Sequence, residues 1–170
     1  MRSSLVPVSA LLLFAACAGD PVAPSTSAAT TAQLAAGPWG PETPNFNLEV
    51  VLRGQGFGLV TFRQPNDADQ IVYLDTWVRD LTPNTSYLLQ RAVDTNLDGE
   101  CTSTGWLTLG KGLTPAAIVT DDQGTGRAEL FRNLSAFQPG ATFDIHFRVI
   151  DAVTAAVVLE SGCYQFTVSL

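Results

Sequence analysis

The strongest constraint on the fold is a period-two alternation of apolar and polar residues that begins at Asn45 and continues to the end of the chain. In the first such segment every second residue is apolar: Phe46, Leu48, Val50 and Leu52. Side chains of a β-strand point alternately to opposite faces, so this pattern is typical of a strand with one buried face. No stretch of the sequence has a clean helical period.

The alternation predicts about eight strands in one domain, residues 45–170. The principal strands are expected at 46–53, 57–63, 71–79, 87–93, 126–131, 141–149, 155–159 and 164–168, with shorter segments at 105–109 and 116–120. Gly, Pro, Asn and Asp separate these segments and are ordinary turn formers. The expected fold is therefore all-β, an antiparallel β-sandwich.

One local motif narrows the type of sandwich. The segment 81–87 reads L-x-P-x-T-x-Y and resembles the tyrosine corner of fibronectin type III and other immunoglobulin-like domains. The resemblance implies an immunoglobulin-like β-sandwich in which the hydroxyl of Tyr87 bonds to the backbone upstream. More strands follow the motif than a standard fibronectin topology contains, so it does not specify the connectivity.

The N-terminal residues have the features of an export signal. Arg2 supplies a positive charge, and a mostly apolar stretch of 12 residues follows at 5–16. A membrane-spanning helix needs about 20 residues, so this stretch is too short to remain as an anchor. The sequence predicts a cleaved signal peptide over 1–16.

The signal ends in Phe14-Ala15-Ala16-Cys17, which resembles the lipobox of bacterial lipoproteins, although Phe14 stands where Leu is usual. The resemblance implies a diacylglyceryl thioether on Cys17, cleavage before it and acylation of the new N-terminus. Ala18 rather than Asp follows the cysteine, which by family analogy sends the protein to the outer membrane. The alternative is an ordinary secretory signal that leaves Cys17 free.

Residues 17–44 are expected to form a flexible linker between the lipid and the domain. The segment consists mainly of Ala, Ser, Thr, Pro and Gly, and its five prolines exclude a continuous helix or strand.

The charge balance excludes one class of partner. The chain has 16 acidic and 9 basic residues, a net charge of −7. Nucleic-acid binding requires clustered Lys and Arg, so no nucleic-acid partner is expected. Docking on anionic lipid by charge is disfavoured for the same reason.

If Cys17 carries lipid, two cysteines remain, Cys101 and Cys163. Disulfides form in exported proteins, so a bridge is expected that ties the acidic loop to the last strand. Two free thiols are the alternative.

The acidic loop itself is a candidate calcium site. Its sequence D-x-N-x-D-G resembles the first half of an EF-hand or dockerin loop, which implies Asp94, Asn96 and Asp98 as side-chain ligands and the Glu100 carbonyl as a fourth. The twelfth position is Gly105 instead of Glu, and no helix flanks the loop. We prefer the alternative, an Asx-rich turn after the strand at 87–93.

No catalytic site is expected. His146 is the single histidine and lies between Asp144 and Arg148 in the alternation, so we expect it to be a solvated position on an outward face. A loose resemblance of 58–110 to copper–zinc superoxide dismutase fails because that metal centre needs several histidines. No Gly-x-Ser-x-Gly motif is present.

Tyr73 and Trp77 share one face of the strand at 71–79. Exposed, they would form a binding face for a sugar or a peptide. Alternation does not determine which face is inside, and we prefer the alternative that a neighbouring strand covers them.

The expected function is that of a non-catalytic binding or structural module, anchored to the cell envelope by its lipid, with an envelope protein or glycan as partner. An accessory subunit of an envelope complex is the alternative. A calcium-dependent or metal-dependent enzyme using the acidic loop and His146 is a further, weaker one.

Overall fold

The computed structural model describes residues 47–65 and 67–169, and within these ranges the protein is all-β and has no helix. The expected all-β class is confirmed. The expected signal peptide (1–16), Cys17 and the linker (17–44) lie outside the described residues. No helix in the described ranges is long and apolar enough to cross a membrane.

Twelve strands make up the fold, and four of them are only two residues long. They are β1 (Asn47–Gly54), β2 (Phe57–Arg63), β3 (Ile71–Arg79), β4 (Ser86–Asp94), β5 (Leu107–Thr108), β6 (Gly110–Lys111), β7 (Thr114–Pro115), β8 (Ile118–Val119), β9 (Gly126–Asn133), β10 (Thr142–Asp151), β11 (Val157–Ser161) and β12 (Tyr164–Thr167).

The expected strands agree closely with the observed ones. β2 and β3 have the predicted bounds, and the other long strands differ by one or two residues at their ends. The short strands β6 and β7 were not predicted, because two residues are too few to display an alternation.

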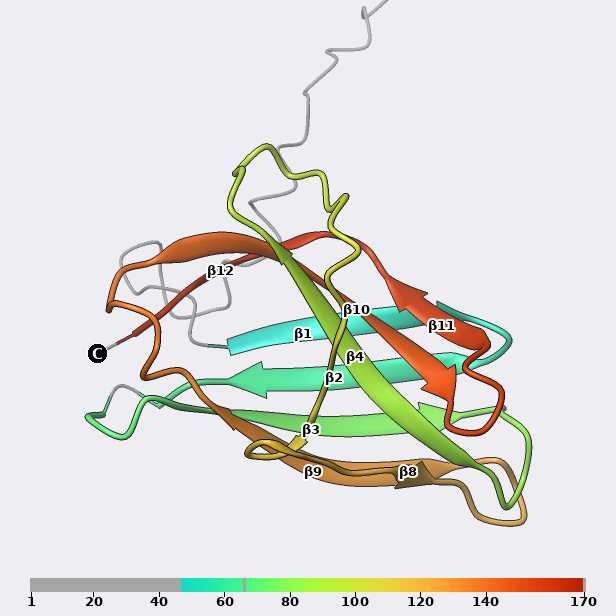
Figure 1. Ribbon diagram of the computed structural model, residues 1–170. Helices are drawn as coiled ribbons and strands as arrows, with labels where there is room; N and C mark the ends of the chain where they lie inside the picture. Colours follow the sequence, from blue (N-terminus) through green and yellow to red (C-terminus); the bar gives the residue numbers. More distant parts are fainter. Residues whose placement is uncertain (1–46, 66, 170) are drawn as a thin grey trace, which may run out of the picture.

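All strands belong to one sheet. Its order is β5-β4-β10-β11-β1-β2-β3-β9-β6-β7, with β12 paired to β10 and β8 paired to β4. Just after β8, an isolated bridge joins Thr120 to Gly126 at the start of β9. The two ends of the sheet therefore approach each other, and the sheet nearly closes into a barrel-like shape. In Figure 1, β1, β2, β3 and β9 lie side by side while β4 and β10 run diagonally across them.

The core fills the space between these two groups of strands. Inward side chains alternate along each strand, so β1 buries Leu48, Val50 and Leu52 and exposes the residues between. Phe62 of β2 packs edge-on against Phe166 of β12, with ring centroids 4.5 Å apart. Burial of each such side chain stabilises the fold by roughly 1.5–3 kcal/mol. The alternation of apolar and polar residues along β1 places the apolar side chains on the buried face.

The hydrogen bond that the tyrosine-corner resemblance implies is present. Tyr87 is only 2% exposed, and its hydroxyl oxygen accepts a hydrogen bond from the Thr82 amide at 3.1 Å. Beside it, the buried Thr120 hydroxyl donates to the Thr82 carbonyl at 2.8 Å and accepts from the Thr85 amide at 3.0 Å. These bonds fix the connection from β3 to β4 against the segment that follows β8.

Candidate functional site

The outward face of β2 and β3 carries the candidate binding residues. Tyr73 and Trp77 are 42% and 36% exposed, so no described strand covers them. The preferred expectation, a second buried face, is therefore wrong. The reason lies in the phase of β3, whose other face supplies Val72, Leu74 and Val78 to the core.

Aromatic rings and arginines alternate in space across this face. The Phe57 and Trp77 rings meet edge-on with centroids 5.9 Å apart. The Arg79 guanidinium carbon lies 5.1 Å from the Phe57 centroid and 5.8 Å from that of Trp77. Arg53 approaches Phe57 to 4.7 Å, and Arg63 approaches Tyr73 to 5.7 Å. We call this set the aromatic–arginine face: Arg53, Phe57, Arg63, Tyr73, Trp77 and Arg79.

Strand register brings these residues together. Phe57 of β2 pairs directly with Arg53 of β1 and with Arg79 of β3. Arg63 pairs with Tyr73 at the opposite end of β2. Directly opposed side chains on one face lie about 4.5–5.5 Å apart at their Cβ atoms, so each arginine reaches a ring.

The acid at the centre of β3 already has a partner. Asp75 receives two hydrogen bonds from Arg127 of β9, Nε to Oδ1 at 2.9 Å and Nη2 to Oδ2 at 2.6 Å. These bonds and the charge of Asp75 raise the pKa of Arg127 above its usual range. Asp75 is consequently paired with Arg127 and not with any arginine of the aromatic–arginine face.

Sequence reasoning found Tyr73 and Trp77 but missed Phe57 and the arginines around it. The available signal was the three-residue gap 54–56 between two predicted strands, which indicates a hairpin. Pairing those strands across the gap would have placed Phe57 beside Arg53 on the same outward face as Trp77.

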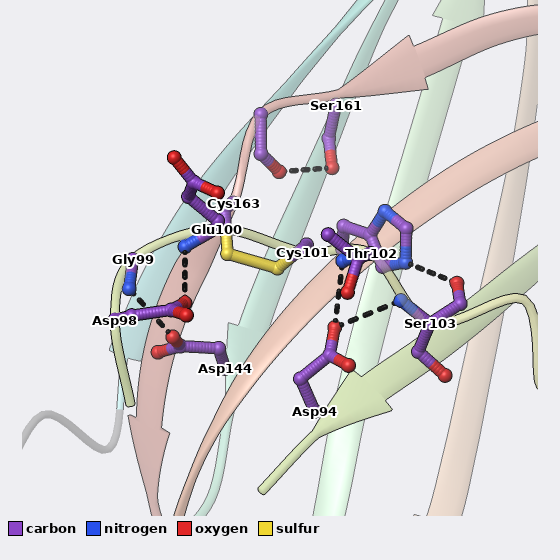
Figure 2. The surroundings of a disulfide bond; sticks show 12 residues. Asp94, Asp98, Gly99, Glu100, Cys101, Thr102, Ser103, Asp144, Ser161 and Cys163 are labelled. Carbon is purple, nitrogen blue, oxygen red and sulfur yellow. Dashed lines mark hydrogen bonds between the residues drawn. A yellow bond between two sulfur atoms is a disulfide. The ribbon is translucent and has the colours of Figure 1, made fainter. Parts of the chain in front are cut away.

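The acidic loop after β4 is held by its own carboxylates (Figure 2). Oδ2 of Asp94 accepts hydrogen bonds from the amides of Thr102 and Ser103 at 2.9 and 3.0 Å. Oδ1 of Asp98 accepts from the Glu100 amide at 2.9 Å, and Oδ2 of Asp98 accepts from the side chain of Asn96. This pattern is that of an Asx-rich turn, the interpretation we preferred.

A buried acid supports the loop from β10. Asp144 is 1% exposed and its Oδ2 accepts from the Gly99 amide at 2.9 Å. Among the described residues, no group of three or more His, Cys, Asp or Glu side chains is placed to hold a metal ion. Calcium binding by Asp94, Asn96, Asp98 and the Glu100 carbonyl stays an untested prediction.

A disulfide ties the same loop to the C-terminal part of the sheet. Cys101 and Cys163 are bonded, with Cα atoms 5.3 Å apart, which confirms the predicted pair. Cys163 lies in the short connection between β11 and β12, immediately before the last strand. In Figure 2 the bond joins the loop to the strand connection beside Asp144.

His146 contacts the loop that follows β4. Its Nε2 donates to the Ser103 carbonyl at 3.1 Å, and its ring lies 4.6 Å from that of Trp106. The Arg148 guanidinium lies over the Trp106 ring, 4.0 Å from its centroid. The expected solvated position is therefore wrong: the loop that includes Ser103 and Trp106 covers this part of the outward face of β10.

No protein family matches the sequence, and no curated protein is significantly similar to it. Function must consequently be inferred from the residues themselves, and the aromatic–arginine face is the most distinctive group of exposed side chains.

Proposed function

We propose that this chain is an exported, lipid-anchored and non-catalytic binding module whose aromatic–arginine face binds a protein partner in the cell envelope. The observation that carries the proposal is the exposure of Tyr73 and Trp77 among stacked arginines on the outward face of the sheet. Trp, Tyr and Arg are the residues that most often dominate binding energy at protein–protein interfaces.

The stacking geometry favours a protein over a glycan. Sugar rings bind aromatic side chains through the flat faces of the rings. Here guanidinium groups lie over the rings of Phe57, Tyr73 and Trp77. A stacked guanidinium still directs its N–H groups outward in its own plane, where they fit carboxylates.

The charge distribution indicates an acidic partner. The chain has 9 basic residues in total and a net charge of −7, yet the aromatic–arginine face holds three arginines. Arg79 has Asp80 as a neighbour, with Nε and Oδ2 3.7 Å apart, whereas Arg53 and Arg63 form no ion pair with a described residue. Arginines of this kind attract a partner with acidic side chains. Binding should therefore weaken as salt concentration rises.

The disulfide supports the proposed location. Bridges such as Cys101–Cys163 persist in oxidising compartments and are rare in reducing ones. The lipobox resemblance at 14–17 supports lipid attachment to Cys17, and the absence of Asp after it supports the outer membrane. Two or more acyl chains anchor a protein stably, and the linker at 17–44 would allow the domain to reach a partner.

We also propose that the domain is an immunoglobulin-like sandwich despite its near closure. The L-x-P-x-T-x-Y motif and the hydrogen bond from the Thr82 amide to the Tyr87 hydroxyl support this assignment. The diagonal crossing of β4 and β10 over β1, β2 and β3 is consistent with two packed layers.

The binding face is tested by a double variant, Trp77→Ala with Arg79→Ala. A photo-crosslinker at Tyr73 identifies the envelope partner in cells that make the full chain, and binding of the purified partner is then measured by calorimetry. We expect the double variant to weaken binding at least 30-fold, as loss of a hot spot of about 2 kcal/mol requires.

The matched control for that experiment is Leu113→Ala with Val153→Ala, two side chains that are 82% and 89% exposed outside this face. The control should bind as the unchanged protein does. Equal affinity of the Trp77–Arg79 variant and the control would refute the proposed face. Retained binding to an isolated polysaccharide, with no protein crosslink, would replace the protein partner by a glycan.

Lipid attachment is tested by mass spectrometry of the exported full chain. We expect a product that begins at Cys17 and carries diacylglyceryl and amide-linked acyl groups, and we expect Cys17→Ser to abolish both cleavage and membrane association. A product that begins at residue 17 with an unmodified thiol would contradict the anchoring proposal and leave the binding-face proposal standing.

A further inference from the structure

Two arginines point into the interior of the sheet. Arg91 of β4 has the same phase as the buried Tyr87 and Leu89, and Arg132 of β9 has the same phase as the buried Leu130. Both are only partly exposed. Charged side chains are rarely directed inward, so these two arginines require a physical reason.

Both arginines line one internal cavity whose other walls are apolar. Aromatic rings and aliphatic side chains form the apolar walls: Phe62, Phe137, Phe143, Phe147, Val72, Leu74, Leu109, Leu134 and Ile145. The cavity volume is about 20 Å³, which is room for about one water molecule. The cavity thus combines two cationic groups with an apolar interior.

Neither arginine is neutralised within the described part of the chain. No described carboxylate lies within 4.0 Å of either guanidinium, because the ion pairs found there involve only Arg79 and Arg127. Arg132 donates from Nη1 to the Gly112 carbonyl at 3.1 Å. Burial first, and the neighbouring charge of Arg132 second, lower the pKa of Arg91. Two partly buried like charges without a counter-ion are unfavourable.

A thin segment covers this part of the molecule. We call residues 107–119 the strap, because they run between β4 and β9 and include the two-residue strands β5, β6, β7 and β8. The strap meets Arg91 through its partner Leu107, and it meets Arg132 through the Gly112 carbonyl. On the β9 side a single residue pair, Lys111 with Phe131, joins β6 to β9. On the β4 side β5 and β8 are both paired, and Leu109 and Ile118 of the strap are buried in the core.

We propose that the interior between β4 and β9 is a binding site for an amphiphilic carboxylate, with the carboxylate between Arg91 and Arg132 and the alkyl chain among the apolar walls. Arginine pairs bind carboxylates by charge-assisted, often bidentate hydrogen bonds, and a ligand carboxylate supplies the missing counter-charge. The cavity holds about one water, so binding of the alkyl chain requires the strap to move outward together with its buried Leu109. This site is separate from the aromatic–arginine face and does not depend on the function proposed for that face.

The test uses decanoate below its micellar concentration, with binding followed by calorimetry and by thermal shift of the disulfide-bonded protein. The variants are Arg91→Met, Arg132→Met and the two together, since Met retains apolar bulk and removes the charge. We expect decanoate to bind and stabilise the unchanged protein. We expect each single variant to weaken binding at least tenfold and the double variant to abolish it, while circular dichroism confirms that each variant is folded.

Three control ligands separate charge from chain. Decanol lacks the charge, decyltrimethylammonium reverses it, and acetate lacks the chain, and none should reproduce the decanoate effect. Trp77→Ala should bind decanoate normally, which excludes adsorption to the aromatic–arginine face. Equal decanoate binding by the double Met variant, or an equal effect of decanol or acetate, would overturn the proposal. If the double variant is unfolded, the unchanged protein is treated with phenylglyoxal, which modifies arginine side chains. Decanoate should protect Arg91 and Arg132 from this modification. Absence of protection would overturn the proposal.

Discussion

At the scale of single residues, buried polar groups decide how the chain turns between its sheet layers. Tyr87 is buried among apolar neighbours, yet its hydroxyl has a defined partner in the Thr82 amide. A buried hydroxyl without a partner costs roughly 1–3 kcal/mol. The residues upstream of Tyr87 must therefore bring a backbone amide within reach of its hydroxyl. Burying a charged group without a counter-ion also costs free energy, which is why the inward Arg91 and Arg132 need an explanation.

We predict that Tyr87→Phe lowers the free energy of unfolding by about 1 kcal/mol, because the Thr82 amide loses its acceptor while the ring still fills the core. Urea denaturation of the disulfide-bonded protein measures the change. Tyr73→Phe is the control: its hydroxyl lies on the exposed face, so its effect should stay within about 0.5 kcal/mol. An equal effect of the two substitutions would show that the Tyr87 hydroxyl contributes nothing specific.

At the scale of elements, the loop between β4 and β5 is ordered by links at both of its ends. The Asp94 carboxylate binds the amides of Thr102 and Ser103, and Cys101 is bonded to Cys163. Neither link belongs to a β-ladder, so side chains provide the main links between this loop and the rest of the sheet. The disulfide is the longer-range link, since it closes 62 residues of chain.

We predict that the double variant Cys101→Ser with Cys163→Ser lowers the free energy of unfolding by about 4 kcal/mol, the chain-entropy value for a loop of this length. Guanidinium chloride unfolding at fixed pH gives the difference. Because the strand pairs of β4 with β10 remain, far-ultraviolet circular dichroism of the variant should stay β-rich. A loss below about 1 kcal/mol would mean that the reduced chain is already restricted in its unfolded state.

At the scale of the whole molecule, a single bridge between the consecutive strands β8 and β9 brings the two ends of the sheet together. The Thr120–Gly126 bridge brings the end of β8 to β9, while β8 also pairs with β4. Thr120 is 2% exposed and bonds to both Thr82 and Thr85. One side chain therefore links the tyrosine corner to the point where the sheet closes.

We predict that Thr120→Val, which keeps the shape and removes the hydroxyl, lowers the free energy of unfolding by about 1–3 kcal/mol, because the Thr85 amide and the Thr82 carbonyl lose a buried partner. Urea unfolding measures this loss, and hydrogen exchange of the Gly126 amide reports opening at the closure point. Thr61→Val on the outward face of β2 is the control. Unchanged stability of Thr120→Val would mean that water replaces the hydroxyl.

The local regularities of the fold were predictable. β2 and β3 have the expected bounds, since each has enough residues to show a period of two. Within the strap, β5 and β8 lie in the segments predicted at 105–109 and 116–120, whereas β6 and β7 were not predictable, because two residues are too few to show an alternation. His146 was placed on a solvated face for a related reason: nothing in the alternation of β10 reveals that a distant loop covers it.

The sequence by itself indicated the long strands and the hydrogen-bonded Tyr87, because both follow from local spacing. It indicated the pairing of Cys101 with Cys163 only on the assumption that Cys17 carries lipid. Only the tertiary structure decided that Tyr73 and Trp77 face outward and that Arg91 and Arg132 face one shared cavity. Alternation gives every strand two equivalent faces, and contact with another layer is what makes one of them the interior.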